Sequence, residues 1–145
     1  MYKNILLPTD GSVLASRAVD AGIELAAAIG ARLTAVVAIE PFHRIAFAPE
    51  QLGFTEASYI APGRAEAGKV LDGVAAKAAS AGVKLDVVLR VSEPAHEAII
   101  EVVTSSGCDL IIIASHGRGG VSALVLGSVT SKVLARTTTP VLVYR

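Results

Sequence analysis

Short apolar runs alternate along this chain with longer segments in which apolar residues recur every three or four positions. The runs cover residues 5–7, 33–39, 83–91, 109–114 and 140–144. Their length fits β-strands, and the segments between them are long enough for crossover helices. The alternation therefore predicts an α/β fold, an open five-stranded parallel sheet with helices on both faces.

The patterns within the runs predict the order of the strands. Residues 83–91 mostly alternate apolar with charged side chains, which indicates an edge strand with one face in water. Residues 110–114 form an unbroken apolar run, which is typical of a strand covered on both faces at the centre of a sheet. With right-handed crossovers, the simplest order is 3-2-1-4-5, a Rossmann-like arrangement.

The helical segments carry end signals. Ser12 is placed to cap the first helix and Gly30 to end it. Ser92 is placed to cap the helix that contains residue 98. The second helix is expected from about residue 66 to Gly82, and the last from about residue 128 to residue 136. We expect His43 and His96 to be exposed.

Residues 41–64 fit neither period and contain Pro41, Pro49 and Pro62. We expect a long connection here, with a short helix around residues 50–54. Such a connection serves as a lid or a partner surface, or it is a plain disordered insertion. The length of 145 residues predicts one domain over residues 1–145, with a variable insertion at about 41–64.

Charge and composition exclude several classes of function. The 13 basic residues balance the 13 acidic ones, which argues against a nucleic-acid-binding face. No stretch offers the roughly 20 uncharged apolar residues of a membrane span. The apolar run at residues 5–7 is too short for the core of a signal peptide. Three dispersed histidines and a single cysteine, Cys108, lack metal-ligand spacing. We expect Cys108 to lie in the core and the protein to be cytoplasmic, with no nucleic-acid or membrane partner.

Polar, glycine-containing segments follow the first and fourth predicted strands, residues 8–12 (PTDGS) and 115–120 (SHGRGG). In open parallel sheets, ligands bind at the carboxyl ends of strands where the strand order reverses, here between strands one and four. Nine residues separate Gly117 from Gly127 and Ser128, at the start of the last helix. Glycine amides and a helix N-terminus bind phosphate, and the Asp10 carboxylate can accept hydrogen bonds from a ribose. A nucleotide is the expected ligand.

These segments resemble the universal stress protein family. Residues 4–12 (NILLPTDGS) are similar to the opening of its single-domain, ATP-binding members. Residues 114–117 (ASHG), with Gly127 and Ser128, are similar to the family's phosphate signature, which is Gly-x-x-Gly, nine residues, then Gly-Ser or Gly-Thr. The similarity extends to residues 107–112 and 139–143. Ala114 replaces the first glycine of the signature, a mild change if position 114 is extended.

The resemblance implies an adenine nucleotide alpha hydrolase-like fold and a set of nucleotide-binding residues: Pro8, Thr9, Asp10, Ala38, Ile113, Ser115, His116, Gly117, Arg118, Gly127, Ser128 and Val129. Asp10 would hold the ribose, Ala38 and the backbone of residues 8–9 would border the adenine, and Ile113 would complete the base pocket. The residues from 117 onward would bind the phosphates, with His116 or Arg118 as helpers. The nucleotide would be ATP, or AMP or ADP, with Mg²⁺ held mainly by phosphates and water.

The resemblance also implies a stress-response binding module that forms homodimers. Residues 141–143 offer an apolar edge strand that a second copy could pair with. Nucleotide binding would order residues 118–126 and the 41–64 segment, and so change a surface that an unidentified protein partner binds.

Two other classes of function compete with this hypothesis. One is a slow ATPase or phosphotransferase, against which stand the missing Walker Gly-Lys-Ser/Thr and the lack of an evident base. The other is a nucleotide-free dimeric scaffold, favoured if Ala114 blocks the phosphate site. We expect no catalytic residue and at most weak ATP hydrolysis.

Overall fold

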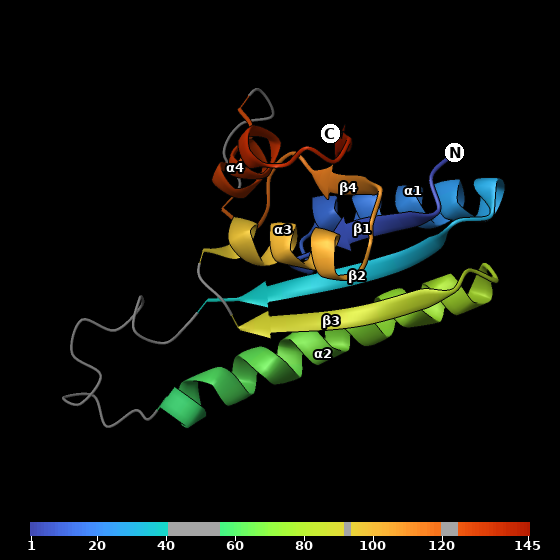
Figure 1. Ribbon diagram of the computed structural model, residues 1–145. Helices are drawn as coiled ribbons and strands as arrows, with labels where there is room; N and C mark the ends of the chain where they lie inside the picture. Colours follow the sequence, from blue (N-terminus) through green and yellow to red (C-terminus); the bar gives the residue numbers. More distant parts are fainter. Residues whose placement is uncertain (41–55, 92–93, 120–124) are drawn as a thin grey trace.

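The computed structural model describes residues 1–40, 56–91, 94–119 and 125–145, and strands alternate with helices along them (Figure 1). In chain order the elements are β1 (Asn4–Pro8), α1 (Val13–Ile29), β2 (Arg32–Ile39), α2 (Glu56–Ser80), β3 (Leu85–Val91), α3 (Ala95–Ser105), β4 (Leu110–Ala114), α4 (Ser128–Arg136) and β5 (Val141–Tyr144). All strand pairs are parallel and the sheet order is β3-β2-β1-β4-β5. The predicted fold class and strand order are confirmed.

Successive strand residues point to opposite faces of the sheet and enter two separate hydrophobic cores. Leu7 and Ile112 belong to the core formed with α1 and α2, whereas Leu6 and Ile111 belong to the core formed with α3 and α4. In Figure 1, α3 lies in front of the sheet and α1 behind it. The sheet is therefore covered on both faces, which explains why β1 and β4 read as continuous apolar runs.

The two central strands separate toward their carboxyl ends. β1 pairs with β2 along its whole length, from Asn4 to Pro8, but it pairs with β4 only at Ile5 and Leu6. Crossovers from β1 and β4 run to opposite sides of the sheet, so no connection covers the space between their ends. The fold thus opens a cleft where the loops after β1 and β4 meet.

The predicted end signals of α1 are confirmed. Ser12 is its N-cap, and the Ser12 hydroxyl oxygen accepts a hydrogen bond from the Ala15 amide at 3.3 Å. Gly30 ends the helix with φ of 71°, a left-handed conformation that glycine adopts without steric cost. The cap places Asp10 and Gly11 in the turn between β1 and α1.

α2 begins earlier than the sequence pattern indicates. It starts at Glu56, so residues 56–64 are helical and Pro62 lies inside the helix. Proline and glycine favour a loop in isolation, but α2 packs on the sheet there: a Cβ at Gly63 would be 3.4 Å from the Ile39 side chain. The short helix expected at residues 50–54, like the rest of the 41–55 segment, lies outside the described residues.

The start of the edge strand also differs from the expectation. The sequence pattern places Val83 in the strand, yet its amide donates to the Ala78 carbonyl oxygen at 2.9 Å, and Gly82 has φ of 68°. This is the hydrogen bonding of a helix C-terminus closed by a left-handed glycine. Val83 therefore completes the end of α2, and β3 begins at Leu85.

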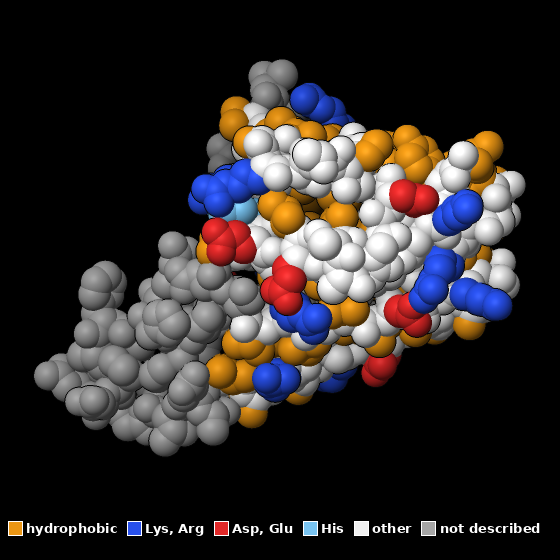
Figure 2. Space-filling model, in the orientation of Figure 1, with side chains coloured by type: hydrophobic (Ala, Val, Ile, Leu, Met, Phe, Trp, Pro, Cys, Tyr) orange, Lys and Arg blue, Asp and Glu red, His pale blue; other side chains and the backbone are white. Residues whose placement is uncertain are grey.

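Charged side chains of both signs are mixed over the face of the molecule that Figure 2 shows. Within the described ranges, none of the helices combines the length and the hydropathy that crossing a membrane requires. Cys108 is buried, as expected, and burial raises the pKa of its thiol.

The prediction that His96 is exposed is wrong. Its side chain is 3% exposed, and Nε2 has no hydrogen-bond partner among the described residues. His96 shares a buried stripe of α3 with Ile99 and Val103. A polar residue type near the start of a helix conceals this spacing in the sequence. The N-cap of α3 is Pro94, without a side-chain cap, and Ser92 lies outside the described residues.

Burial lowers the pKa of His96, and the nearby cations Arg136 and Lys132 lower it further against the smaller opposite effect of Glu97. The unfolded chain therefore binds this proton more readily than the native protein. The ordinary pKa of histidine is 6.5. We predict that, because of His96, the protein loses stability as the pH falls below this value. Urea denaturation between about pH 7.5 and pH 5.5 measures the slope. The slope should be smaller in His96→Gln, and equal slopes in the two proteins would contradict the prediction.

Candidate functional site

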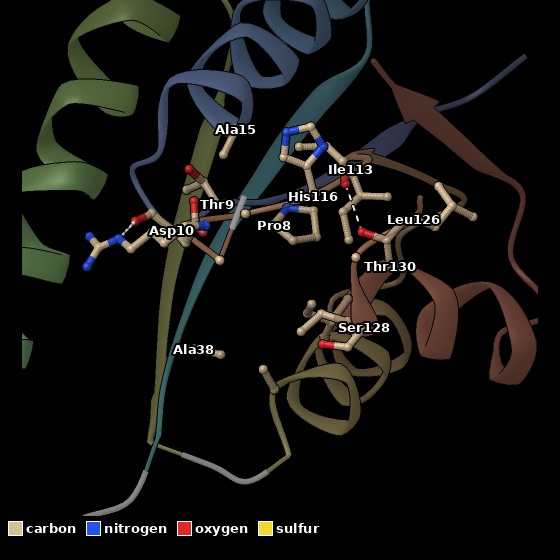
Figure 3. Close-up of a pocket in the computed structure, with 18 of the residues that line it drawn as sticks. Pro8, Thr9, Asp10, Ala15, Ala38, Ile113, His116, Leu126, Ser128 and Thr130 are labelled. Atoms are coloured by element: carbon tan, nitrogen blue, oxygen red, sulfur yellow. Dashed lines mark hydrogen bonds between the residues drawn. The ribbon is translucent and has the colours of Figure 1, made fainter. Parts of the chain in front are cut away.

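A cavity of about 540 Å³ lies at the carboxyl ends of β1, β2 and β4, a size common for sites that bind small molecules (Figure 3). Its walls come from the loop after β1, the end of β2, the start of α3, the loop after β4 and the start of α4. All of the predicted nucleotide-binding residues except Ser115 line this cavity. The loops after β1 and β4, separated by about a hundred residues in sequence, therefore form one site.

Part of the cavity wall is apolar. It is made by Pro8, Val36, Ala38, Ile99 and Ile113. Ile113 is 5% exposed and Val36 is 1% exposed, so this wall is continuous with the core between the sheet and α3. A flat aromatic ring fits such a wall better than a charged group does.

The backbone of Ala38 offers polar groups beside this apolar wall. The Leu33 amide donates to Lys84, before β3, and the Val36 carbonyl oxygen accepts from Thr9, after β1. Odd-numbered residues of β2 thus face β3 and even-numbered ones face β1. Pairing between β1 and β2 ends at Pro8 and Val36, so the N–H and C=O of Ala38 face the cavity beyond the end of β1.

Asp10 also lines the cavity, and amides from two loops hold its carboxylate. Its Oδ1 accepts from the Ser12 amide at 2.9 Å, and its Oδ2 accepts from the Arg118 amide at 3.0 Å. Burial raises the pKa of Asp10, but the hydrogen bonds from Ser12 and Arg118, with the Arg118 charge, outweigh burial and leave the pKa below 3.8. Asp10 is thus an ionised acceptor at neutral pH, and each oxygen keeps further acceptor capacity.

Two glycines allow the close approach of these segments. A Cβ at Gly117 would lie 2.3 Å from Asp10 Oδ2, a distance at which atoms overlap. A Cβ at Gly127 would lie 3.1 Å from the His116 Cα and 3.3 Å from the Ser115 carbonyl oxygen. Neither glycine has a positive φ, so both are needed here for space rather than for backbone conformation.

The N-terminus of α4 points its first amides toward the cavity. Gly127 is the N-cap and supplies no side-chain cap, while Ser128 and Val129 line the cavity in the first turn. The Gly127 amide donates to the Ser115 carbonyl oxygen at 2.7 Å, and the Thr130 hydroxyl donates to the Ala114 carbonyl oxygen at 2.8 Å. The helix start is therefore fixed to the end of β4, and its free amides and dipole favour an anion.

Ala114 is in the extended conformation, in which the replacement of glycine by alanine is a mild change. It is the last residue of β4, in register with Tyr144, and no described residue other than glycine has a positive φ. It packs in a small cluster with Ala15 and Ala18 of α1. The added methyl group therefore finds room against α1.

Some residues of the cavity differ from the expected set. Ser115 is 4% exposed and does not line the cavity, because its backbone is bonded to Tyr144 and Gly127 and its hydroxyl lies 3.1 Å from His116 Nδ1. Sequence reasoning missed several lining residues: Ala15, Val36, Glu40, Ala95, Ile99, Ala114, Gly119, Val125, Leu126 and Thr130. The order of the elements offered one signal for Ala95 and Ile99: the helix that follows the third strand must begin at the edge of the sheet where the cavity lies.

Comparisons with known proteins agree with this architecture. Residues 1–145 match the model of the Universal stress protein family. A universal stress protein of Thermus aquaticus is 38% identical over 148 residues, covering 100% of both chains. The structure of MJ0577 from Methanocaldococcus jannaschii has a TM-score of 0.85 at 28% identity, covering 99% of this chain and 96% of that one. A universal stress protein in complex with cAMP has a TM-score of 0.72 at 26% identity, covering 99% and 97% of the two chains.

The sheet order and the cleft at its switch point define a Rossmann-like α/β protein with a candidate ligand site between β1 and β4. The match over the whole chain makes the assignment more specific: the chain belongs to the universal stress protein family. The family resemblance of the two loops is thereby confirmed.

The contact between Gly117 and Asp10 generates a stability prediction that does not depend on any ligand. Gly117→Ala would push the Asp10 carboxylate away from the Arg118 amide and lower the free energy of unfolding by about 1–3 kcal/mol. Gly119→Ala is the matched control, because a Cβ at Gly119 meets no atom of the described residues within 4 Å. This substitution should change stability by less than about 0.5 kcal/mol. Urea denaturation measures both, and equal effects of the two substitutions would contradict the prediction.

Proposed function

We propose that this protein is an ATP-binding regulatory module of the stress response, located in the cytoplasm and acting as a homodimer. One observation carries the proposal: a single cavity combines an apolar slot, an ionised carboxylate and an uncapped helix N-terminus. These three features suit the base, the sugar and the phosphates of one nucleotide. A module that binds a nucleotide can transmit its occupancy to a protein partner by a shift between conformations.

The backbone of Ala38 supports adenine as the base. Adenine presents an acceptor, N1, beside a donor, its exocyclic amine, and this pattern matches one backbone N–H and one C=O. Guanine presents the reverse pattern, a donor at N1 and an acceptor at O6. With Ile113 and Ile99 forming the apolar wall, the site favours an adenine ring between β2 and α3.

The phosphates would lie against the start of α4, with the amides of Ser128 and Val129 as donors. The protein offers little to a metal ion by itself: no group of three or more His, Cys, Asp or Glu that could hold a metal occurs in the described part of the chain. Mg²⁺ prefers phosphate oxygens, water and one or two carboxylates. Mg²⁺ would therefore enter with ATP and be held mainly by the phosphates and water.

One solved relative supports nucleotide binding. The universal stress protein solved with cAMP covers 99% of this chain at 26% identity, and its ligand is an adenine nucleotide. The three-phosphate form is our inference from the helix N-terminus at the far end of the cavity. A regulatory role, rather than catalysis, is our inference from the absence of a Walker lysine in the loop after β4.

The edge strand β5 supports dimerisation. β5 pairs only with β4 in the described sheet, which leaves its other edge open, and Leu142 is 43% exposed. An open apolar edge can pair with the same edge of a second copy around a two-fold axis. The proposed dimer therefore forms through residues 141–143.

Nucleotide binding can be measured by calorimetry with ATP, AMP and GTP. We predict that ATP binds and that GTP binds more weakly, because GTP reverses the donor and acceptor pattern at Ala38. Asp10→Ala should weaken ATP binding roughly tenfold or more, since it removes hydrogen bonds to a charged group. Arg17→Ala on the exposed face of α1 is the control and should bind as the native protein does.

Three results would contradict the proposal in different ways. No binding by the native protein supports the nucleotide-free scaffold. Turnover of ATP well above the solvent background supports the slow enzyme. Binding that is unchanged in Asp10→Ala places the nucleotide elsewhere on the protein.

Dimerisation through β5 predicts that Leu142→Lys shifts the protein from dimer to monomer in sedimentation experiments. A lysine at a paired edge places a charge in the interface and prevents strand pairing. Val87→Lys is the matched control, because Val87 is a half-exposed apolar residue on β3, the opposite edge strand. Dissociation by Val87→Lys, with Leu142→Lys still dimeric, would move the interface to β3.

A further inference from the structure

Arg118 joins three segments of the structure. Its amide donates to Asp10 Oδ2 at 3.0 Å, and its Nε donates to the backbone carbonyl oxygen of Asp10 at 2.9 Å. Its Nη2 forms an ion pair with Glu66 Oε1 of α2 at 2.8 Å. One residue thus links the loop after β4 to the loop after β1 and to α2.

The guanidinium lies on the side of Asp10 that faces α2. A Cβ at Gly11 would be 3.6 Å from Arg118 Nη2 and 2.8 Å from the Val70 side chain of α2. Figure 3 shows Ser128, at the start of α4, across the cavity from Asp10. The guanidinium is therefore committed to Asp10 and Glu66, at the sugar side of the proposed site, and not to the helix N-terminus that would hold phosphates.

The Asp10 carboxylate depends on these contacts for its orientation. The Ser12 amide fixes Oδ1 and the Arg118 amide fixes Oδ2, while the missing side chain of Gly117 lets the two loops approach this closely. A carboxylate held by two amides presents its remaining lone pairs in a fixed direction. Without the Arg118 side chain, the hydrogen bond from the Arg118 amide is the one that, among the described residues, would still hold the loop after β4 against Asp10.

We propose that Arg118 is the positioning residue for sugar recognition: its side-chain bonds to the Asp10 carbonyl and to Glu66 hold its amide against the Asp10 carboxylate, which then accepts the ribose hydroxyls. This inference rests on the proposed nucleotide site and assigns Arg118 to the sugar rather than to the phosphates. Glu66 of α2 acts through Arg118. Binding of the sugar hydroxyls thereby depends on the position of α2.

Variants of these residues should fold. The side chains of Arg118 and Glu66 are 59% and 63% exposed, and exposed ion pairs add little to stability. The native protein, Arg118→Ala, Arg118→Lys and Glu66→Gln can therefore be compared directly, with Arg17→Ala as the control for loss of an exposed positive charge. Calorimetry would measure Kd for ATP, 2′-deoxy-ATP, 3′-deoxy-ATP and AMP with each protein.

The native protein is expected to prefer ATP over at least one of the two deoxy analogues by about tenfold, because a hydroxyl bonded to a carboxylate is lost. In Arg118→Ala this preference should fall to about threefold or less, while the ratio of the AMP and ATP dissociation constants stays unchanged. Arg118→Lys should behave like Arg118→Ala, because lysine keeps the charge but cannot make the two directed bonds. Glu66→Gln should reduce the preference by less, and adding it to Arg118→Ala should have no further effect.

Other outcomes would overturn the inference. A weakening in Arg118→Ala that grows with the number of phosphates, with rescue by lysine, makes Arg118 a phosphate ligand. An unchanged preference for ATP in Arg118→Ala, or equal binding of all three sugars by the native protein, shows that Arg118 does not act through Asp10. No nucleotide binding by the native protein instead refutes the proposed function, and this inference with it.

Discussion

The divergence of β1 and β4 is the constraint on which the site depends. These strands pair only at Ile5 and Leu6, while each stays paired with its other neighbour to its end. Right-handed crossovers to opposite sides leave the gap between them uncovered. Polar groups of the two loops then form hydrogen bonds with each other, as the Asp10 carboxylate does with the Arg118 amide. The cleft is a product of topology, and its chemistry is a product of two short loops.

Patterns in the sequence predicted the fold because a strand buried on both faces and a strand buried on one face have different apolar patterns. The unbroken run of β4 and the alternation of β3 distinguished a central strand from an edge strand, and the order followed. The pattern failed at Pro62 and Gly63, where packing against Ile39 overrides local preference. It failed also at His96, whose helical stripe was hidden by a polar residue type.

The site was predictable to the level of loops but not of side-chain orientation. Strand order alone indicated that the loops after the first and fourth strands would meet, and residues 8–10 and 116–119 of these loops do line one cavity. Spacing could not show that the Ser115 carbonyl oxygen accepts a hydrogen bond from the Gly127 amide, or that the Arg118 guanidinium reaches Glu66. Both depend on contacts between residues far apart in sequence, and no local pattern records them.

The polar groups of Ala38 that face the cavity belong to the main chain, and strand alternation fixes their direction. Their presentation is therefore largely independent of which amino acid occupies position 38. Related chains can diverge at this position and keep the same donor and acceptor, with proline as the exception because it lacks the N–H. Preference for a base encoded in this way leaves no signature in the residue type, so relatives with dissimilar side chains here can still share a ligand.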